Sequence, residues 1–191
     1  YTTLFRSPHE YAEQVTHIDN DNITAAKEAT QYLIDLGHRR IGFIGGSKDM
    51  MVTVTRLEGY KRALTENHIP IRDDYIIHEE FLLDGGKQGV LEIMSSKEPP
   101  TALLVTDDLM TLGVLHSLHM MGYDIPGEIS VISFNNALFS ELSNPPLTSV
   151  DINILELGIQ AVKHLLAIIE NPKELVKRVI VPHKIIIRGS C

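Results

Sequence analysis

Short apolar runs alternate with stretches of helical periodicity from Pro8 onward, and this alternation limits the possible folds more than any other feature. We expect strands at 15–18, 41–44, 75–77, 101–105, 129–134 and 179–187. Between them, apolar residues recur every three to four positions, which predicts helices near 22–36, 57–64, 86–94, 109–121 and 155–169. Near-continuous apolar strands separated by helices favour an α/β fold, with a parallel sheet covered by helices on both faces.

Composition and charge exclude several classes of protein. The chain is 43% apolar and 22% charged, which is typical of a globular domain, and its net charge of −8 argues against nucleic-acid binding through its own surface. Cys191 is the single cysteine, so a disulfide scaffold is excluded and a reducing compartment fits. The nine histidines show no metal-binding spacing, and no apolar run approaches the roughly 20 residues of a membrane helix. We expect a cytoplasmic protein without metal, cofactor or membrane partner.

The first seven residues, Tyr1 to Ser7, read like the translation of a short sequencing adaptor. We interpret residues 1–7 as an assembly scar, and a genuine strand start is the alternative. With a scar, the chain would be a truncated C-terminal piece of a longer protein. The loop from Asn144 to Leu147 is the best candidate in the sequence for a crossing between subdomains.

Polar and aromatic residues follow the predicted strands, and parallel sheets bind ligands at that edge. Arg56, Phe81, Asp107 and Asn135 are the candidates. Guanidinium, carboxylate and amide groups hold the hydroxyls of a polyol, and an aromatic ring stacks on a sugar face. Each residue also has a structural interpretation: a solvated arginine, a core phenylalanine, a helix N-cap and a turn asparagine, respectively. The site therefore resembles a sugar site.

Catalytic motifs are missing from the sequence. The turn at Gly45 and Gly46 does not match G-x-G-x-x-G, and neither G-x-x-x-x-G-K-[ST] nor G-x-S-x-G occurs. The pair Asp107 and Asp108 could act as a general acid and base or hold magnesium, but Asp108 fits a helix cap or a structural hydrogen-bond partner better. We predict no catalytic residues, and metal-dependent turnover would mark the alternative, an enzyme on a doubly wound fold.

The predicted helix at 109–121 carries two apolar stripes, although a surface helix needs only one. The first is Met110, Val114, Leu118 and Met121, and the second is Leu112, Leu115 and His119. Apolar residues also occupy the predicted loop at 138–142. We predict a homodimer interface, with burial of the second stripe within the fold as the alternative. The interface residues would be Leu112, Leu115, His119, Leu138, Phe139 and Leu142.

Short motifs in a fixed order give the chain a family resemblance. They are Ile18–Asn22, Gly37–Ile41, Arg56–Tyr60, Pro100–Ala102, Asp108–Met110 with Gly113, Ile125–Ile132, Pro145–Val150, Leu157–Gly158, and Arg188 with Ser190. From Pro8 onward the chain resembles the effector-binding core of the lactose/galactose repressor family of bacterial transcription regulators.

The resemblance implies a periplasmic-binding-protein-like core of two doubly wound parallel-sheet subdomains, with three chain crossings between them and the effector in the cleft. Residues 8–38 and 152–174 would be the remnant of a truncated N-terminal subdomain. Residues 39–150 and 175–191 would form the C-terminal subdomain. The family's DNA-binding helix-turn-helix is not in this chain, so operator DNA would be bound only through that other segment. The implied partners are a sugar effector, a second copy of the chain and, as a candidate coregulator, a phosphocarrier protein.

In the family, residues at the positions of Arg56, Asp107 and Asn135 contact the effector, the aromatic position near Phe81 stacks on it, and Asp19 lies near the cleft. The family usually has Asn at position 107 and Asp at position 135, so this chain exchanges the two. Residues 134–136 and 180–184 look most like maltose-operon regulators of Gram-positive bacteria. An exported sugar-binding protein of the same fold is the alternative to a repressor.

Overall fold

The computed structural model describes residues 16–171 and 175–191, and the expected scar at residues 1–7 lies outside them. Its main element is a six-stranded sheet in the order β3-β2-β4-β5-β6-β8. The strands are β2 (Ile41–Gly45), β3 (Ile76–His78), β4 (Ala102–Val105), β5 (Ser130–Phe134), β6 (Thr148–Asp151) and β8 (Lys184–Ile186). The first five are parallel, and β8 is antiparallel to β6. The predicted α/β fold is confirmed, although β6 was not among the predicted strands.

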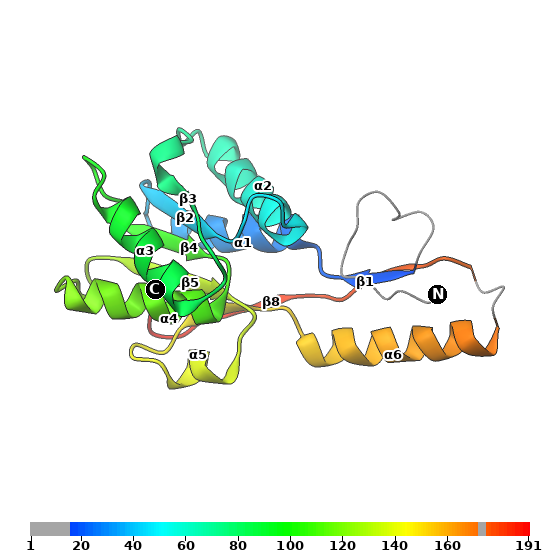
Figure 1. Cartoon of the computed structure of the whole chain (residues 1–191). Helices are drawn as coiled ribbons and strands as arrows, with labels where there is room; N and C mark the ends of the chain where they lie inside the picture. Colours follow the sequence, from blue (N-terminus) through cyan, green and yellow to red (C-terminus); the bar gives the residue numbers. More distant parts are fainter. Residues whose placement is uncertain (1–15, 172–174) are drawn as a thin grey trace.

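Helices cover both faces of this sheet (Figure 1). The helices α1 (Asn22–Asp35) and α2 (Met51–Glu66) pack together and share one core cluster with β2, β4 and β5. The helices α3 (Leu83–Met94) and α4 (Asp108–Met120) pack together in the second cluster, on the other face. A 3-10 helix, η2 (Asp73–Tyr75), precedes β3, and α5 (Leu138–Leu142) follows β5. Strands β2, β4 and β5 are buried throughout because helices cover them on both sides.

Two glycines allow α3 and α4 to approach closely. A Cβ atom at Gly86 would lie 1.8 Å from the carbonyl oxygen of Met110, and one at Gly113 would lie 1.9 Å from that of Leu83. Each helix therefore presents a glycine to the backbone of the other. This close packing fixes the N-terminal end of α4 at the carboxyl edge of the sheet.

A smaller unit lies beside the large sheet (Figure 1). It contains β1 (His17–Asp19) paired in parallel with β7 (Arg178–Ile180), and α6 (Ile154–Glu170), which packs on β1. The predicted apolar stripe of α6 is present, but in the described structure it is exposed: Leu155, Ile159, Val162, Leu166 and Ile169 are each at least half exposed.

Several boundaries differ from the sequence predictions. The single strand predicted at 179–187 is wrong, because Val181 leaves the small sheet and the chain joins the large sheet only at Lys184. The predicted crossing at 144–147 is also wrong, since this loop leads from α5 to β6 within the large unit. The chain instead crosses between the units near Asn20, Ile152 and residues 181–183.

These crossings also move the expected division into subdomains. The helix α1, assigned to the remnant 8–38, packs in the core of the large unit because its alanine face fits against α2. The strand β7, assigned with residues 175–191 to the C-terminal subdomain, pairs with β1 in the small sheet. Among the described residues, the small unit therefore consists of β1, α6 and β7.

Candidate functional site

Arg56 lies on α2 at the carboxyl edge of the large sheet and is only 2% exposed. Its Nε donates to Asn22 Oδ1 at 3.0 Å, and its Nη1 donates to the carbonyl oxygen of Thr106 at 2.6 Å. The guanidinium carbon lies 4.0 Å from the ring centroid of Phe134, a cation–π distance. These contacts come from α1, from the loop after β4 and from β5, so the positive charge has a fixed position. The alternative interpretation of Arg56 as a solvated surface residue is wrong.

Asp107 follows β4 by two residues and is the N-cap residue of α4. One carboxylate oxygen accepts from the backbone N–H of Met110 at 3.1 Å and caps α4, as the structural interpretation predicted. The other oxygen accepts from Asn135 Nδ2 at 2.9 Å. Burial raises the pKa of Asp107, while backbone N–H donors and the charge of Arg56 act in the opposite direction. Capping therefore occupies only Oδ1 of Asp107, and Oδ2 binds the side chain of Asn135.

Asn135 and Asn136 have a backbone that L-residues seldom adopt, with φ of 98° and 52°. Asparagine tolerates this region better than most residues, which explains the residue type directly after β5. The turn directs the side chain of Asn135 to Asp107, and Asn136 Oδ1 accepts from Arg188 Nη2 at 2.7 Å. The turn interpretation of Asn135 is therefore compatible with its place in the polar site.

Asp108 points into a different environment from Asp107. It is 1% exposed, and its carboxylate accepts from the hydroxyls of Ser133, Ser140 and Ser149 and from the backbone N–H of Ala137. These donors belong to β5, α5 and β6 and to the turn between β5 and α5. The prediction of a structural hydrogen-bond partner is confirmed. The carboxylates of Asp107 and Asp108 therefore accept from separate sets of donors.

Asp19 connects to Arg56 through a residue that the sequence analysis did not select as a site residue, Asn22. Asn22 Nδ2 donates to Asp19 Oδ1 at 3.2 Å, and its Oδ1 accepts from Arg56. Asn22 is 6% exposed although it begins a helix, and only its place in the motif 18–22 could have drawn attention to it. The structure thus links Asp19 to Arg56 through Asn22, and it joins Asp107 to Asn135 at the ends of the neighbouring strands β4 and β5.

Phe81 lies apart from these hydrogen bonds. It is partly buried, packs against the second core cluster, and approaches the backbone of Gly46 so closely that a Cβ there would lie 2.4 Å from the ring. Gly46 follows β2, so the ring does lie at the predicted edge of the sheet. Its packing agrees in part with the alternative interpretation as a core residue.

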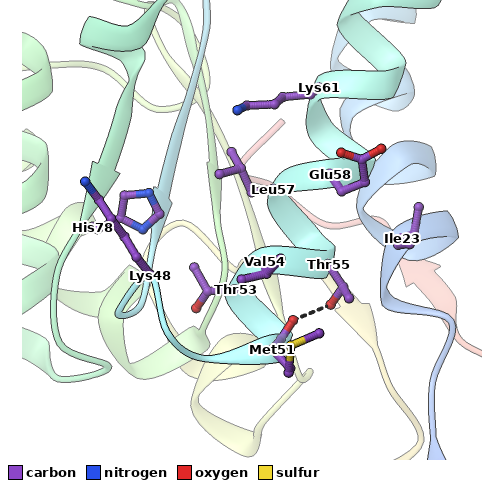
Figure 2. A pocket seen from close by; sticks show the side chains of 10 residues that line it. All are labelled: Ile23, Lys48, Met51, Thr53, Val54, Thr55, Leu57, Glu58, Lys61 and His78. Atoms are coloured by element: carbon purple, nitrogen blue, oxygen red, sulfur yellow. Dashed lines mark hydrogen bonds between the residues drawn. The ribbon is translucent and has the colours of Figure 1, made fainter. Parts of the chain in front are cut away.

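A hollow runs along the outer face of α2 (Figure 2). Lys48 and His78 line it from one side, Ile23 from α1 lies on the other, and the remaining lining residues belong to α2. The five predicted site residues are Asp19, Arg56, Phe81, Asp107 and Asn135. None of them is among the described residues that line this hollow. The polar groups at the strand ends, and not this hollow, therefore correspond to the predicted site.

The residues predicted for a dimer interface have different exposures. Leu138 and Leu142 are 76% and 74% exposed on α5, which replaces the predicted loop, and His119 is exposed on α4. Leu112 and Phe139 are partly exposed. Leu115 is 6% exposed and belongs to the second core cluster, so its assignment to the interface is corrected. The alternative of burial within the fold thus holds for Leu115.

Within residues 16–171 and 175–191, no helix is long and apolar enough to cross a membrane. No group of three or more histidine, cysteine, aspartate or glutamate side chains within them is placed to hold a metal ion.

Comparison with known proteins adds independent findings. A family model described as a periplasmic binding protein-like domain matches residues 30–191. Catabolite control protein A from Priestia megaterium is 36% identical over 184 residues, which cover 95% of this chain and 55% of that protein. The chain spans about half the length of the curated relatives that it matches.

Solved structures agree with this match. A putative transcriptional regulator LacI from Bacillus cereus subsp. cytotoxis NVH 391-98 superposes with a TM-score of 0.94 and is 45% identical, covering 97% of this chain and 66% of that one. The transcriptional regulator CelR in complex with cellobiose has a TM-score of 0.90 and is 30% identical, covering 94% of this chain and 55% of that one.

Proposed function

Because the chain belongs to the lactose/galactose repressor family of transcription regulators and contains its periplasmic-binding-protein-like domain, we propose that it is the sugar-sensing and dimerisation core of a bacterial repressor. One observation carries the proposal: a buried arginine is fixed beside a hydrogen-bonded Asp107–Asn135 pair at the carboxyl edge of a parallel sheet. This edge is where open α/β sheets bind their ligands.

The chemistry of these groups suits sugar hydroxyls, which both donate and accept hydrogen bonds. A carboxylate oxygen has more than one acceptor position, so Asp107 can accept from a hydroxyl while it still caps α4. Asn135 offers both a donor and an acceptor, and Arg56 offers only donors. Phe81 would stack against the apolar face of the sugar ring. The site would thus bind a neutral polyol through directional contacts.

The proposed effector is maltose or a related malto-oligosaccharide. The support is the likeness of residues 134–136 and 180–184 to maltose-operon regulators. The exchange of Asn and Asp between positions 107 and 135 keeps the total charge and changes which position donates. Maltose, like the cellobiose bound by the relative CelR, is a glucose disaccharide.

The proposed partners follow from the same family membership. Operator DNA would be bound by a segment outside this chain, which agrees with the net charge of −8. A second copy would pack on the surface formed by Leu138, Leu142 and His119. The exposed stripe of α6 would be covered by further parts of the N-terminal subdomain. A cytoplasmic location is part of the proposal, and a phosphocarrier protein is a candidate coregulator because catabolite control protein A is a relative.

Ligand-dependent melting of the full-length protein tests the proposal. With maltose at 100 times its Kd, we expect about 2.7 kcal/mol of added stability, which raises the Tm by several degrees. Arg56→Met keeps the apolar contact with Phe134 but removes every donor, so the shift should disappear. Arg62→Met on the same helix is the matched control, because Arg62 is exposed and pairs only with Glu58 among the described residues. An equal shift in both variants would contradict the proposed site. If cellobiose or ribose acts and maltose does not, the sugar assignment fails and the site stands.

A further inference from the structure

A single side chain joins the three segments that cross between the two units. Asn20 is 6% exposed, and its Nδ2 donates to the carbonyl oxygens of Ile152 at 2.9 Å and Val181 at 2.8 Å. Each of these oxygens lies in one of the other two crossings, 132 and 161 residues further along the chain. Val181 also donates its backbone N–H to the carbonyl oxygen of Asp19 at 2.9 Å. The three crossings are therefore held together at Asn20.

Asparagine is well suited to this position. Its amide nitrogen has two protons on a short side chain, so it can satisfy two carbonyl oxygens at once. Buried carbonyl oxygens that lose their donor are costly, and water does not replace the bond where the site is closed. Both Ile152 and Val181 are 2% exposed, which makes the amide of Asn20 their direct link across the crossing.

We call the two hydrogen bonds from Asn20 Nδ2 to Ile152 and Val181 the clamp. One side chain, that of Asn22, separates the clamp from the proposed sugar site. Asn22 Nδ2 faces Asp19 Oδ1 at 3.2 Å and the carbonyl oxygen of Asn20 at 3.4 Å. On its other side, Asn22 Oδ1 accepts from Arg56 Nε at 3.0 Å. A displacement of the guanidinium therefore acts on the segment that carries the clamp. Hydrogen bonds are short and directional, so such a displacement favours one geometry of the crossing over another.

We propose that Asn20 is a positioning residue of the hinge and that Asn22 couples it to Arg56. The inference rests on the proposed function, because it gives the sugar at Arg56 a route to the relative arrangement of the two units. Sugar binding changes the populations of the two arrangements only if the contacts differ between them. The bonds of Asn20 would supply that difference, because they join all three crossings between the units.

The first measurement uses the full-length regulator with dyes on cysteines at the exposed positions 97 in the large unit and 163 on α6, in a Cys191→Ser background. In the wild type, we expect maltose to change the energy transfer between the dyes. In Asn20→Ser, calorimetry should give a maltose Kd within about three-fold of wild type, since the side chain of Asn20 donates to two backbone carbonyl oxygens and to none of the proposed sugar-binding side chains. The maltose-induced change in energy transfer should fall at least five-fold. Wild-type affinity together with a wild-type change would overturn the proposal.

The matched control is Asn67→Ser. Asn67 Nδ2 also donates twice, to Ala63 O at 2.9 Å and Gln31 Oε1 at 2.6 Å, but both partners lie in the large unit. This variant loses similar bonds without affecting a crossing, so its energy transfer should respond to maltose like wild type. A loss of response as large as that of Asn20→Ser would mean general destabilisation and would refute the hinge role.

Hydrogen exchange without sugar separates this inference from the proposed function. The amide of Val181 should exchange about ten-fold faster in Asn20→Ser than in wild type, which corresponds to about 1.4 kcal/mol. Asn22→Asp should also speed this exchange, because it removes the donor to Asp19 and Asn20, and it serves if Asn20→Ser does not fold. If the amide of Val181 exchanges at the wild-type rate in both variants, the clamp is refuted, regardless of which sugar the protein binds. Failure of maltose to bind wild type, with faster exchange in the variants, refutes only the sugar assignment.

Discussion

Replacing Asn135 by aspartate tests the polar pair at the sheet edge most directly. The substitution keeps the shape of the side chain but puts an oxygen where the amide nitrogen now lies, 2.9 Å from the carboxylate of Asp107. A donor–acceptor contact becomes a contact between two carboxylates. The variant therefore has an acidic residue at both position 135 and position 107.

The expected magnitude follows from the distance. Two unit charges about 3 Å apart repel by roughly 5 kcal/mol at an effective dielectric constant of 20. The lost hydrogen bond to a charged group adds about 1.5 to 3 kcal/mol, and rotation of the new, partly exposed carboxylate away from Asp107 would relieve part of the sum. We expect Asn135→Asp to lose about 3 kcal/mol of unfolding free energy at pH 7.5.

The direction of the pH dependence in Asn135→Asp follows from the two carboxyl groups that would lie side by side at positions 107 and 135. Two adjacent carboxyls hold a proton between them, so one folded-state pKa lies above its unfolded value of about 3.9. The folded state then binds more protons than the unfolded state, and stability falls as the pH rises through that raised pKa. Burial already raises the pKa of Asp107 in the natural chain, so wild type should show the same trend with a smaller slope.

Urea unfolding followed by circular dichroism at pH 7.5 and pH 5.0 measures these values. Asn135→Asp should recover part of its lost stability at pH 5.0. The double variant Asp107→Asn with Asn135→Asp restores an amide opposite a carboxylate and should lie within about 1 kcal/mol of wild type at both pH values. The reasoning is refuted if the single variant is as stable as wild type at pH 7.5, or if the second substitution does not rescue it.

Three further predictions concern packing, titration and assembly. Gly113→Ala would place a methyl group against the carbonyl oxygen of Leu83 and should cost about 3 kcal/mol in urea unfolding. Burial lowers the pKa of His38, so the folded state should lose stability as the pH drops below about 6.5. His38→Gln should reduce this loss, which urea unfolding at pH 7.5 and pH 5.5 measures. Leu138→Asp should shift the full-length protein toward monomer in analytical ultracentrifugation. Leu91→Asp, which changes another exposed apolar residue, should not. Equal behaviour of the two variants would argue against a dimer interface at Leu138, Leu142 and His119.

Local patterns in the sequence determined the fold class and the polar residues at the carboxyl edge of the large sheet. Largely apolar runs such as 101–105 and 129–134 favour strands that are covered on both faces, which predicts a parallel sheet. The residues that follow such strands lie at the carboxyl edge, so the sequence predicts that Asp107 and Asn135 lie there, and in the structure they are hydrogen-bonded to each other. The caps at Asp21 and Asp107 are likewise local, since each carboxylate bonds an amide three residues ahead.

Only the tertiary structure decided which sheet each strand joins and what each polar side chain contacts. The run 179–187 reads as one strand, yet its two halves pair with β1 and β6, which are far apart in sequence. The bonds of Asn20 span 132 and 161 residues, and those of Asp108 reach from 25 to 41 residues away. Periodicity reports which face of an element is buried and carries no information about its partner. For that reason the residues at the sheet edge can be identified from the sequence, while the hinge clamp and its link to Arg56 appear only once the chain has folded.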